Sequence, residues 1–172
     1  LAPTRNVRFS VTVEETAGTE RNGEVVARGL PFPAGSLRKA LRKGPLELGA
    51  AARILDQIAS ALASAHNQGI VHGAVKPANI LFQKGEPVVA DFGIALAVSA
   101  AGEGRLTETG LSLGTPYYMS PEQAMAKRIV LDHRTDVYSL GVVLYEMLTL
   151  ERPFAGDSRE EVLSAIMTKE PR

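Results

Sequence analysis

The sequence predicts an α+β fold, mostly helical with two small β-hairpins, and three observations on apolar spacing support this. Val7, Phe9, Val11 and Val13 alternate with polar residues, a period of two that is typical of a half-buried strand. Between residues 48 and 67 apolar side chains recur every fourth position, which indicates an amphipathic helix. Two short apolar runs, NILF and PVVADF, are separated only by QKGE, which favours a second hairpin.

The first hairpin is expected over residues 6–30. The polar segment ETAGTERNGE separates the alternating strand from a second short strand, VVARGL. A lone hairpin is marginal in water, so this one must pack against another part of the protein. After PFPAG the pattern changes to helices.

Capping residues set the expected helix bounds. Ser36 is a suitable N-cap for LRKALRK, and Gly44 a suitable end. The long helix over 48–67 presents Ile54, Ile58 and Leu62, with Leu55, Ala61 and Ala65 beside them, and Gly69 follows it.

In the second half of the chain we expect one loop followed by two helices. Residues 99–115 are rich in Gly, Ser and Thr and are expected to form a loop. A buried helix is expected over 137–149 with Asp136 as its cap. The last helix begins with a capping box of Ser158 and Glu161, ahead of Val162, Leu163, Ile166 and Met167.

Composition limits the class of protein. The 172 residues have zero formal net charge and are 45% hydrophobic, so the chain is globular and gives no electrostatic argument for nucleic acid. There is no Cys, which suits a reducing compartment. The longest apolar stretch is too short to span a bilayer, and the start lacks a secretion signal. We expect a soluble, cytoplasmic segment without membrane contact.

Four motifs occur in a fixed order: HGAVKPAN at 72–79, DFG at 91–93, GTPYYMSPEQA at 114–124 and DVYSLG at 136–141. Each motif alone is weak, but the ordered set is not expected by chance. The set resembles the C-terminal lobe of eukaryotic-type Ser/Thr protein kinases, most closely the Hanks-type kinases of bacteria. The resemblance implies a protein-kinase-like fold, with residues 1–35 as a remnant of N-lobe strands and hinge. Residues 36–172 would form a C-lobe that lacks its last helices.

The resemblance also implies ATP and Mg²⁺ as cofactors. Asp91 and Asn79 would hold the metal ions, Lys76 would neutralise the transferred phosphoryl group, and Leu81 would lie beneath the adenine ring. These residue types suit phosphoryl transfer, in which the protein mainly positions and neutralises charge. Simpler readings stay open: a lone Asp-Phe-Gly is often a capped turn, a loop Lys is often solvated, and Leu81 fits a plain core residue equally well.

Four further residues would have structural roles by the same resemblance. His72 would pack near Phe92, and Glu122 would pair with an Arg that the family has nearer its C-terminus. Asp136 would accept hydrogen bonds from the backbone of the 72–79 loop, a role compatible with capping its helix.

The sequence departs from the family pattern in three ways. Ala74 stands where the family has its catalytic Asp, and a methyl group accepts no proton. Gly73 stands where the family has the Arg that receives a phosphothreonine, although Thr107 and Thr109 resemble the regulatory threonines. The Gly-rich loop and the ATP-binding Lys of the family have no counterpart in this sequence.

Three functions therefore compete. The chain could be an inactive pseudokinase that binds a protein partner or substrate through the helices around 137–168 and the activation segment. It could be an ATP-dependent kinase completed by a missing N-lobe, or a non-functional remnant. An uncovered hairpin would leave an apolar patch near Phe9 and Val11, so self-association is expected.

Overall fold

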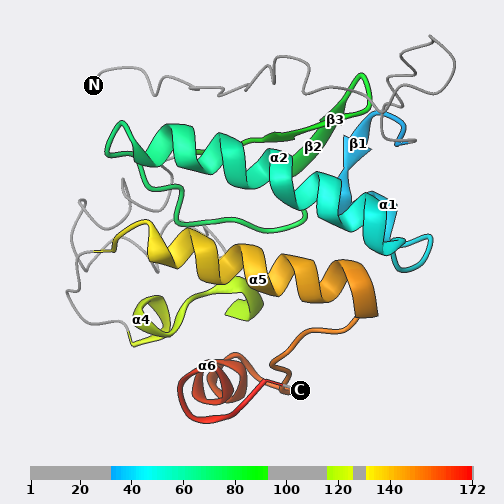
Figure 1. Cartoon of the computed structure of the whole chain (residues 1–172). Helices are drawn as coiled ribbons and strands as arrows, with labels where there is room; N and C mark the ends of the chain where they lie inside the picture. The colour runs from blue at the N-terminus through cyan, green and yellow to red at the C-terminus, as the bar shows by residue number, and fades with distance from the viewer. Residues whose placement is uncertain (1–31, 93–115, 126–130, 172) are drawn as a thin grey trace, which may run out of the picture.

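The computed structural model describes residues 32–92, 116–125 and 131–171. Within them, the fold consists of a small antiparallel sheet, two long helices and several shorter helices (Figure 1). The hairpin expected over 6–30 and the loop expected over 99–115 lie outside the described residues, as does the patch near Phe9 and Val11. The mostly helical α+β architecture predicted from apolar spacing is confirmed.

The sheet has the order β1-β2-β3 and contains the second predicted hairpin. Strands β2 (Ile80–Gln83) and β3 (Glu86–Val89) pair antiparallel through a two-residue turn. Both turn residues, Lys84 and Gly85, have left-handed φ angles of 52° and 88°, which match the twist of a tight hairpin. The prediction missed β1 (Gly35–Ser36), because a two-residue strand has no periodic signal.

The first two helices follow their predicted caps. Helix α1 (Leu37–Leu41) starts at Ser36, whose Oγ accepts a hydrogen bond from the Lys39 backbone N–H at 3.4 Å. Helix α2 (Leu48–His66) buries the apolar face that the sequence predicted: Ala51, Ile54, Ile58, Ala61, Leu62 and Ala65.

Helix α5 (Arg134–Thr149) begins three residues before the predicted start, so the expected capping role of Asp136 is wrong. The exposed Asp132 carboxylate accepts the Arg134 backbone N–H at 2.9 Å instead. Asp136 lies in the first turn and is completely buried. Its carboxylate is therefore available to a neighbouring segment.

Three short elements complete the described fold: the 3₁₀ turn η1 (Pro116–Tyr118), α4 (Pro121–Ala124) and α6 (Arg159–Thr168). Ser158 caps α6 as predicted, and its Oγ accepts the Glu161 N–H at 3.1 Å. The Glu161 carboxylate accepts from the Asp157 N–H rather than from that of Ser158. The predicted capping box is thus only half formed.

Helices α2 and α5 run antiparallel, and the 67–79 segment passes between them before it enters β2 (Figure 1). The main core joins α1, α2, the sheet and α5 through Leu37, Ile54, Ile58, Ile80, Val89, Val143 and Met147. A smaller core holds α6 against α4 through Ala124, Phe154, Val162, Ala165 and Ile166. In the described part of the chain, every helix is too short or too polar to cross a bilayer.

Candidate functional site

The buried carboxylate of Asp136 anchors the 72–79 loop to α5. Oδ2 accepts the His72 backbone N–H at 2.9 Å, and Oδ1 accepts the Gly73 N–H at 2.7 Å. Nε2 of His66, from the last turn of α2, lies 2.7 Å from Oδ2. One carboxylate thus joins both long helices to the start of the loop, which is the contact with the loop backbone that the resemblance implied.

The His72 side chain links the loop to the end of β3. Its Nε2–H donates to the Ala90 carbonyl at 2.9 Å, and its Nδ1 accepts the Ala74 N–H at 3.1 Å. These two bonds require the neutral ring with its proton on Nε2. Burial lowers the pKa of His72 below its ordinary value and favours the same neutral form. The ring also packs on Phe92, with 4.5 Å between ring centroids.

The strand register brings Asn79 and Asp91 to the same end of the β2–β3 hairpin. Ile80 pairs with Val89, and the Ala90 N–H donates to the Asn79 carbonyl at 2.8 Å. The buried Asn79 side chain donates from Nδ2 to the Ala74 carbonyl at 2.9 Å. Asp91 is exposed and has a left-handed φ of 65°, which is uncommon for a residue other than Gly.

Gly73 and Ala74 form their hydrogen bonds within the described residues through backbone atoms, because neither has a polar side chain. In addition to the bonds above, Nε2 of Gln123 on α4 donates to the Gly73 carbonyl at 2.8 Å. Gly73 has a left-handed φ of 70°, a conformation that Gly adopts without the steric cost paid by other residues. The loop is therefore held in place independently of the side chains at positions 73 and 74.

The 72–79 loop contains a cation, Lys76, and an amide, Asn79, but no carboxylate that could accept a proton. Lys76 is half-buried in the same loop, and residues 70–84 contain no Asp or Glu. Ala74, which the resemblance aligns with the family's catalytic Asp, has only a methyl group, and a methyl group accepts no proton. The site can neutralise and orient an anion, but it cannot take a proton from a hydroxyl group through residue 74.

The oxygen donors present fit Mg²⁺ only together with phosphate. Asn79 and Asp91 supply an amide and a carboxylate, the hard oxygen ligands that Mg²⁺ prefers. Among the described residues no group of three or more Asp, Glu or His side chains could hold a metal ion. Because Mg²⁺ in nucleotide sites is usually held by one or two carboxylates plus phosphates, this donor set suits a metal–nucleotide complex.

Leu81 lies on the face of β2 opposite to the core. Ile80 and Phe82 are buried, whereas Leu81 is half-buried between its partners Ser36 and Val88. A ligand that covered this face of the sheet would contact Leu81 next to the β1 backbone.

A protein kinase domain model matches residues 24–171. The chain belongs to the protein kinase family. It is 43% identical over 136 residues to serine/threonine-protein kinase pkn3 of Myxococcus xanthus, covering 76% of this chain and 24% of that protein. It is 46% identical over 126 residues to serine/threonine-protein kinase PknL of Mycobacterium tuberculosis, covering 72% of this chain and 30% of PknL. The chain thus spans about a quarter of the length of these curated relatives.

Beside the loop, the kinase chain has a second cluster on η1 and α5. The Tyr118 hydroxyl donates to the Glu146 carboxylate, and burial followed by this bond raises the pKa of Tyr118. Arg152 lies 4.1 Å from the centre of the Tyr117 ring and 3.8 Å from Glu146. Ser139 holds the same turn, with its Oγ donating to the Tyr118 carbonyl at 2.7 Å.

Glu122 is half-buried on α4, and no Lys or Arg within 32–92, 116–125 or 131–171 forms an ion pair with it. Its charge is one cause, after burial, of the raised pKa of Tyr138. Thr107 and Thr109 lie outside the described residues. His66 and Gln123 were not predicted as site residues, because their only signals were their places at the end of a helix and within SPEQA.

Proposed function

We propose that this protein kinase chain acts as a pseudokinase: it binds a metal–nucleotide complex weakly or not at all, transfers no phosphate, and works in signalling by binding a protein partner. The observation that carries the proposal is Ala74 at the base position of a loop whose residues 72–74 are held through backbone hydrogen bonds. A general base contributes typically about 10²–10⁴ in rate. Its absence would slow transfer strongly even if nucleotide were bound.

The remaining loop residues support binding without chemistry. Bound Mg·ATP would supply the phosphoryl group and the metal charge. Asn79 and Asp91 would hold the metal ions, Lys76 would neutralise a phosphate, and Leu81 would support the base. His72 keeps Ala74 and Ala90 in fixed relation, so the position of Asp91 next to Ala90 is set by the fold.

The partner surface in this proposal is formed by the activation segment and the helices around 137–168. Exposed apolar side chains occur on three of these elements: Val137 of α5 is 61% exposed, Met125 after α4 is 46% exposed, and Met167 of α6 is 43% exposed. A contiguous patch formed by such side chains would be typical of a protein contact surface.

A second candidate is an active Ser/Thr kinase whose Gly-rich loop and ATP-binding Lys come from outside these 172 residues. The intact bonds from Asp136 to the loop backbone favour this candidate, because a functional loop requires the same support. The loose transition state of phosphoryl transfer also makes the base less essential than it is in acyl transfer.

Thermal unfolding with and without Mg·ATP tests nucleotide binding. Saturation at roughly one hundred times the dissociation constant would stabilise the chain by about 2.7 kcal/mol. Asp91→Asn is the matched variant, because this exposed side chain should affect the nucleotide response rather than the fold. A nucleotide-induced shift that is retained in Asp91→Asn would contradict the metal role, and a missing cooperative transition would favour the non-functional remnant.

Transfer of labelled phosphate to a generic basic protein tests the inactive state. We expect no incorporation by the unaltered chain, and none by the double variant Gly73→Arg/Ala74→Asp, since the other half of the nucleotide site is still required. Incorporation by the unaltered chain would refute the pseudokinase proposal, and it would also show that transfer does not require the parts that the second candidate takes from outside these residues.

A further inference from the structure

A hollow lies beside α1, the helix whose Arg38 backbone N–H donates to the Pro77 carbonyl of the 72–79 loop at 3.0 Å. Its volume is about 200 Å³, smaller than the roughly 300–1,000 Å³ typical of small-molecule sites. None of the residues 72–79, nor Asp91, contributes to its wall. We call it the α1 hollow; it is lined by Phe32, Pro33, Ala34, Gly35, Ser36, Lys39, Ala40, Lys43, Gly44, Pro45, Leu46 and Phe82.

The wall of the α1 hollow is mostly apolar and is fixed by the fold. The rings of Phe32 and Phe82 stack with 4.5 Å between centroids, and Phe82 belongs to the main core. On the opposite side, the Leu46 N–H donates to the Met147 carbonyl at 2.8 Å. The hollow is thus bounded by β2, α1 and a segment attached to α5, all of which are parts of the core.

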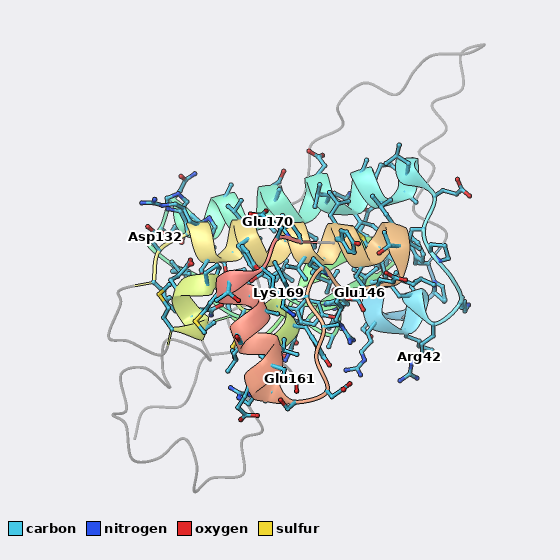
Figure 2. The ribbon with its side chains drawn as sticks, turned by 90° about the horizontal axis from the view of Figure 1, so that it is seen from below. Arg42, Asp132, Glu146, Glu161, Lys169 and Glu170 are labelled. Atoms are coloured by element: carbon cyan, nitrogen blue, oxygen red, sulfur yellow. The ribbon has the colours of Figure 1, made fainter. Side chains whose placement is uncertain are left out.

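The rim of the α1 hollow is basic. Lys39 and Lys43 line it, Arg38 lies on α1, and Arg42 is the C-cap residue of that helix. All four side chains are exposed, and within the described ranges none forms an ion pair. Figure 2 shows Arg42 extending from α1 into solvent. Four positive charges within six residues stand in contrast to the zero net charge of the whole chain.

The Lys39 stem is held at the edge of the hollow by its neighbours. A Cβ atom at Gly35 would lie 3.4 Å from Cδ of Lys39, so the stem covers the Gly35 backbone. Aliphatic lysine stems often pack on apolar surface in this way while the ammonium group stays in water. Lys39 therefore combines a place in the apolar wall with a charge at the rim.

We propose that the α1 hollow binds an acidic protein segment that inserts one large apolar side chain. The volume suits a single side chain, and the unpaired basic rim complements acidic residues on either side of it. A nucleic acid is less favoured because the neutral chain lacks an extended basic surface. A lipid surface is less favoured because α1 has five residues, too few for an interfacial amphipathic helix.

An array of short acidic peptides tests the proposal on the 172-residue chain. One central position carries each of the twenty amino acids, and Glu and Asp flank it. We expect binding that requires Phe, Leu or another large apolar residue at the central position and that weakens with salt. Absence of binding, or binding independent of the central residue, would overturn the proposal.

Two variants separate the rim from the hollow in a fluorescence polarisation assay with the best array peptide. Lys39→Glu/Lys43→Glu should weaken binding by roughly tenfold or more, because two attractions become repulsions. Ala40→Phe should fill the hollow and reduce binding to that of a peptide with Ser at the central position. The control Lys84→Glu/Lys169→Glu makes the same charge change on the β2–β3 turn and after α6, and should leave affinity unchanged.

Other outcomes are informative because the α1 hollow shares no lining residue with the 72–79 loop. Equal weakening by the rim variant and the charge control would refute a local site, as would tighter binding to anionic vesicles or RNA than to the peptides. Thermal unfolding of each variant excludes loss of fold as the cause. The response to Mg·ATP should be unchanged in all of them, so failure of this proposal is distinguishable from failure of the proposed function.

Discussion

Replacing Asp136 by Ala should destabilise the chain more than its place on the helix would suggest. The substitution removes the acceptor of the buried His72 N–H and of the part-buried Gly73 N–H, and an unpaired buried donor costs about 1–3 kcal/mol. With the part-buried donor at the low end of that range, the total is about 2–4 kcal/mol, a large part of the roughly 5–15 kcal/mol that stabilises a typical domain. The His66 side chain is 15% exposed, so water can replace its hydrogen bond to Asp136. The loss of that bond therefore adds little to the destabilisation.

Urea unfolding followed by far-ultraviolet circular dichroism measures this loss. Asp136→Asn keeps one carbonyl oxygen, and hence one of the two bonds, so about 1–3 kcal/mol should be lost. Asp56→Ala, on the exposed face of α2, is the control and should change stability little. If Asp136→Ala unfolds at the same urea concentration as the control, the loop is held by other contacts and our account of the site is wrong.

Three other predictions follow from single residues. Burial lowers the pKa of His72 from 6.5, so its contribution to stability is complete above about pH 6.5 and declines as the pH falls below it; urea midpoints between about pH 8 and about pH 5 should depend less on pH in His72→Gln. At Gly73, with its φ of 70°, Ala should cost about 1–2 kcal/mol, and an unchanged urea midpoint would contradict the left-handed conformation. A Cβ at Gly156 would lie 2.7 Å from Cβ of Glu161, whereas one at Gly141 meets no atom within 4 Å. Gly156→Ala should therefore lower the melting temperature and Gly141→Ala raise it, the latter by up to about 1 kcal/mol of helix propensity; the opposite order would refute the packing described for α6.

The helices and the hairpin were predictable because their signals are local. The four-residue repeat of Ile54, Ile58 and Leu62 defines the buried face of α2, and Ser36 and Ser158 cap the helices that follow them. The start of α5 was predicted too late because Asp is a common N-cap residue type. The actual role of Asp136, to accept the Gly73 N–H, involves a loop 63 residues away in sequence. β1 has two residues and exists only because β2 lies beside it.

The sequence predicted which residues form the candidate site, but it did not predict the hydrogen bonds among them. The motifs named Asn79, Asp91 and His72, but no spacing rule indicates that Asn79 donates to the Ala74 carbonyl or that Gln123 donates to that of Gly73. Such bonds join side chains to the backbone of distant residues, and any backbone carbonyl is chemically equivalent to any other. Only the three-dimensional arrangement selects the partner.

The backbone-only attachment of Gly73 and Ala74 separates folding from chemistry. Side chains of α4 and α5 bind the peptide groups of Gly73, and the side chains of His72 and Asn79 bind those of Ala74, so the side chains at positions 73 and 74 can change while these bonds persist. A kinase built in this way can gain or lose its base with little effect on folding, apart from the left-handed conformation at position 73. The same arrangement makes the two positions suitable for installing a new side chain, such as a ligand or a reporter group, at the centre of an otherwise unchanged loop.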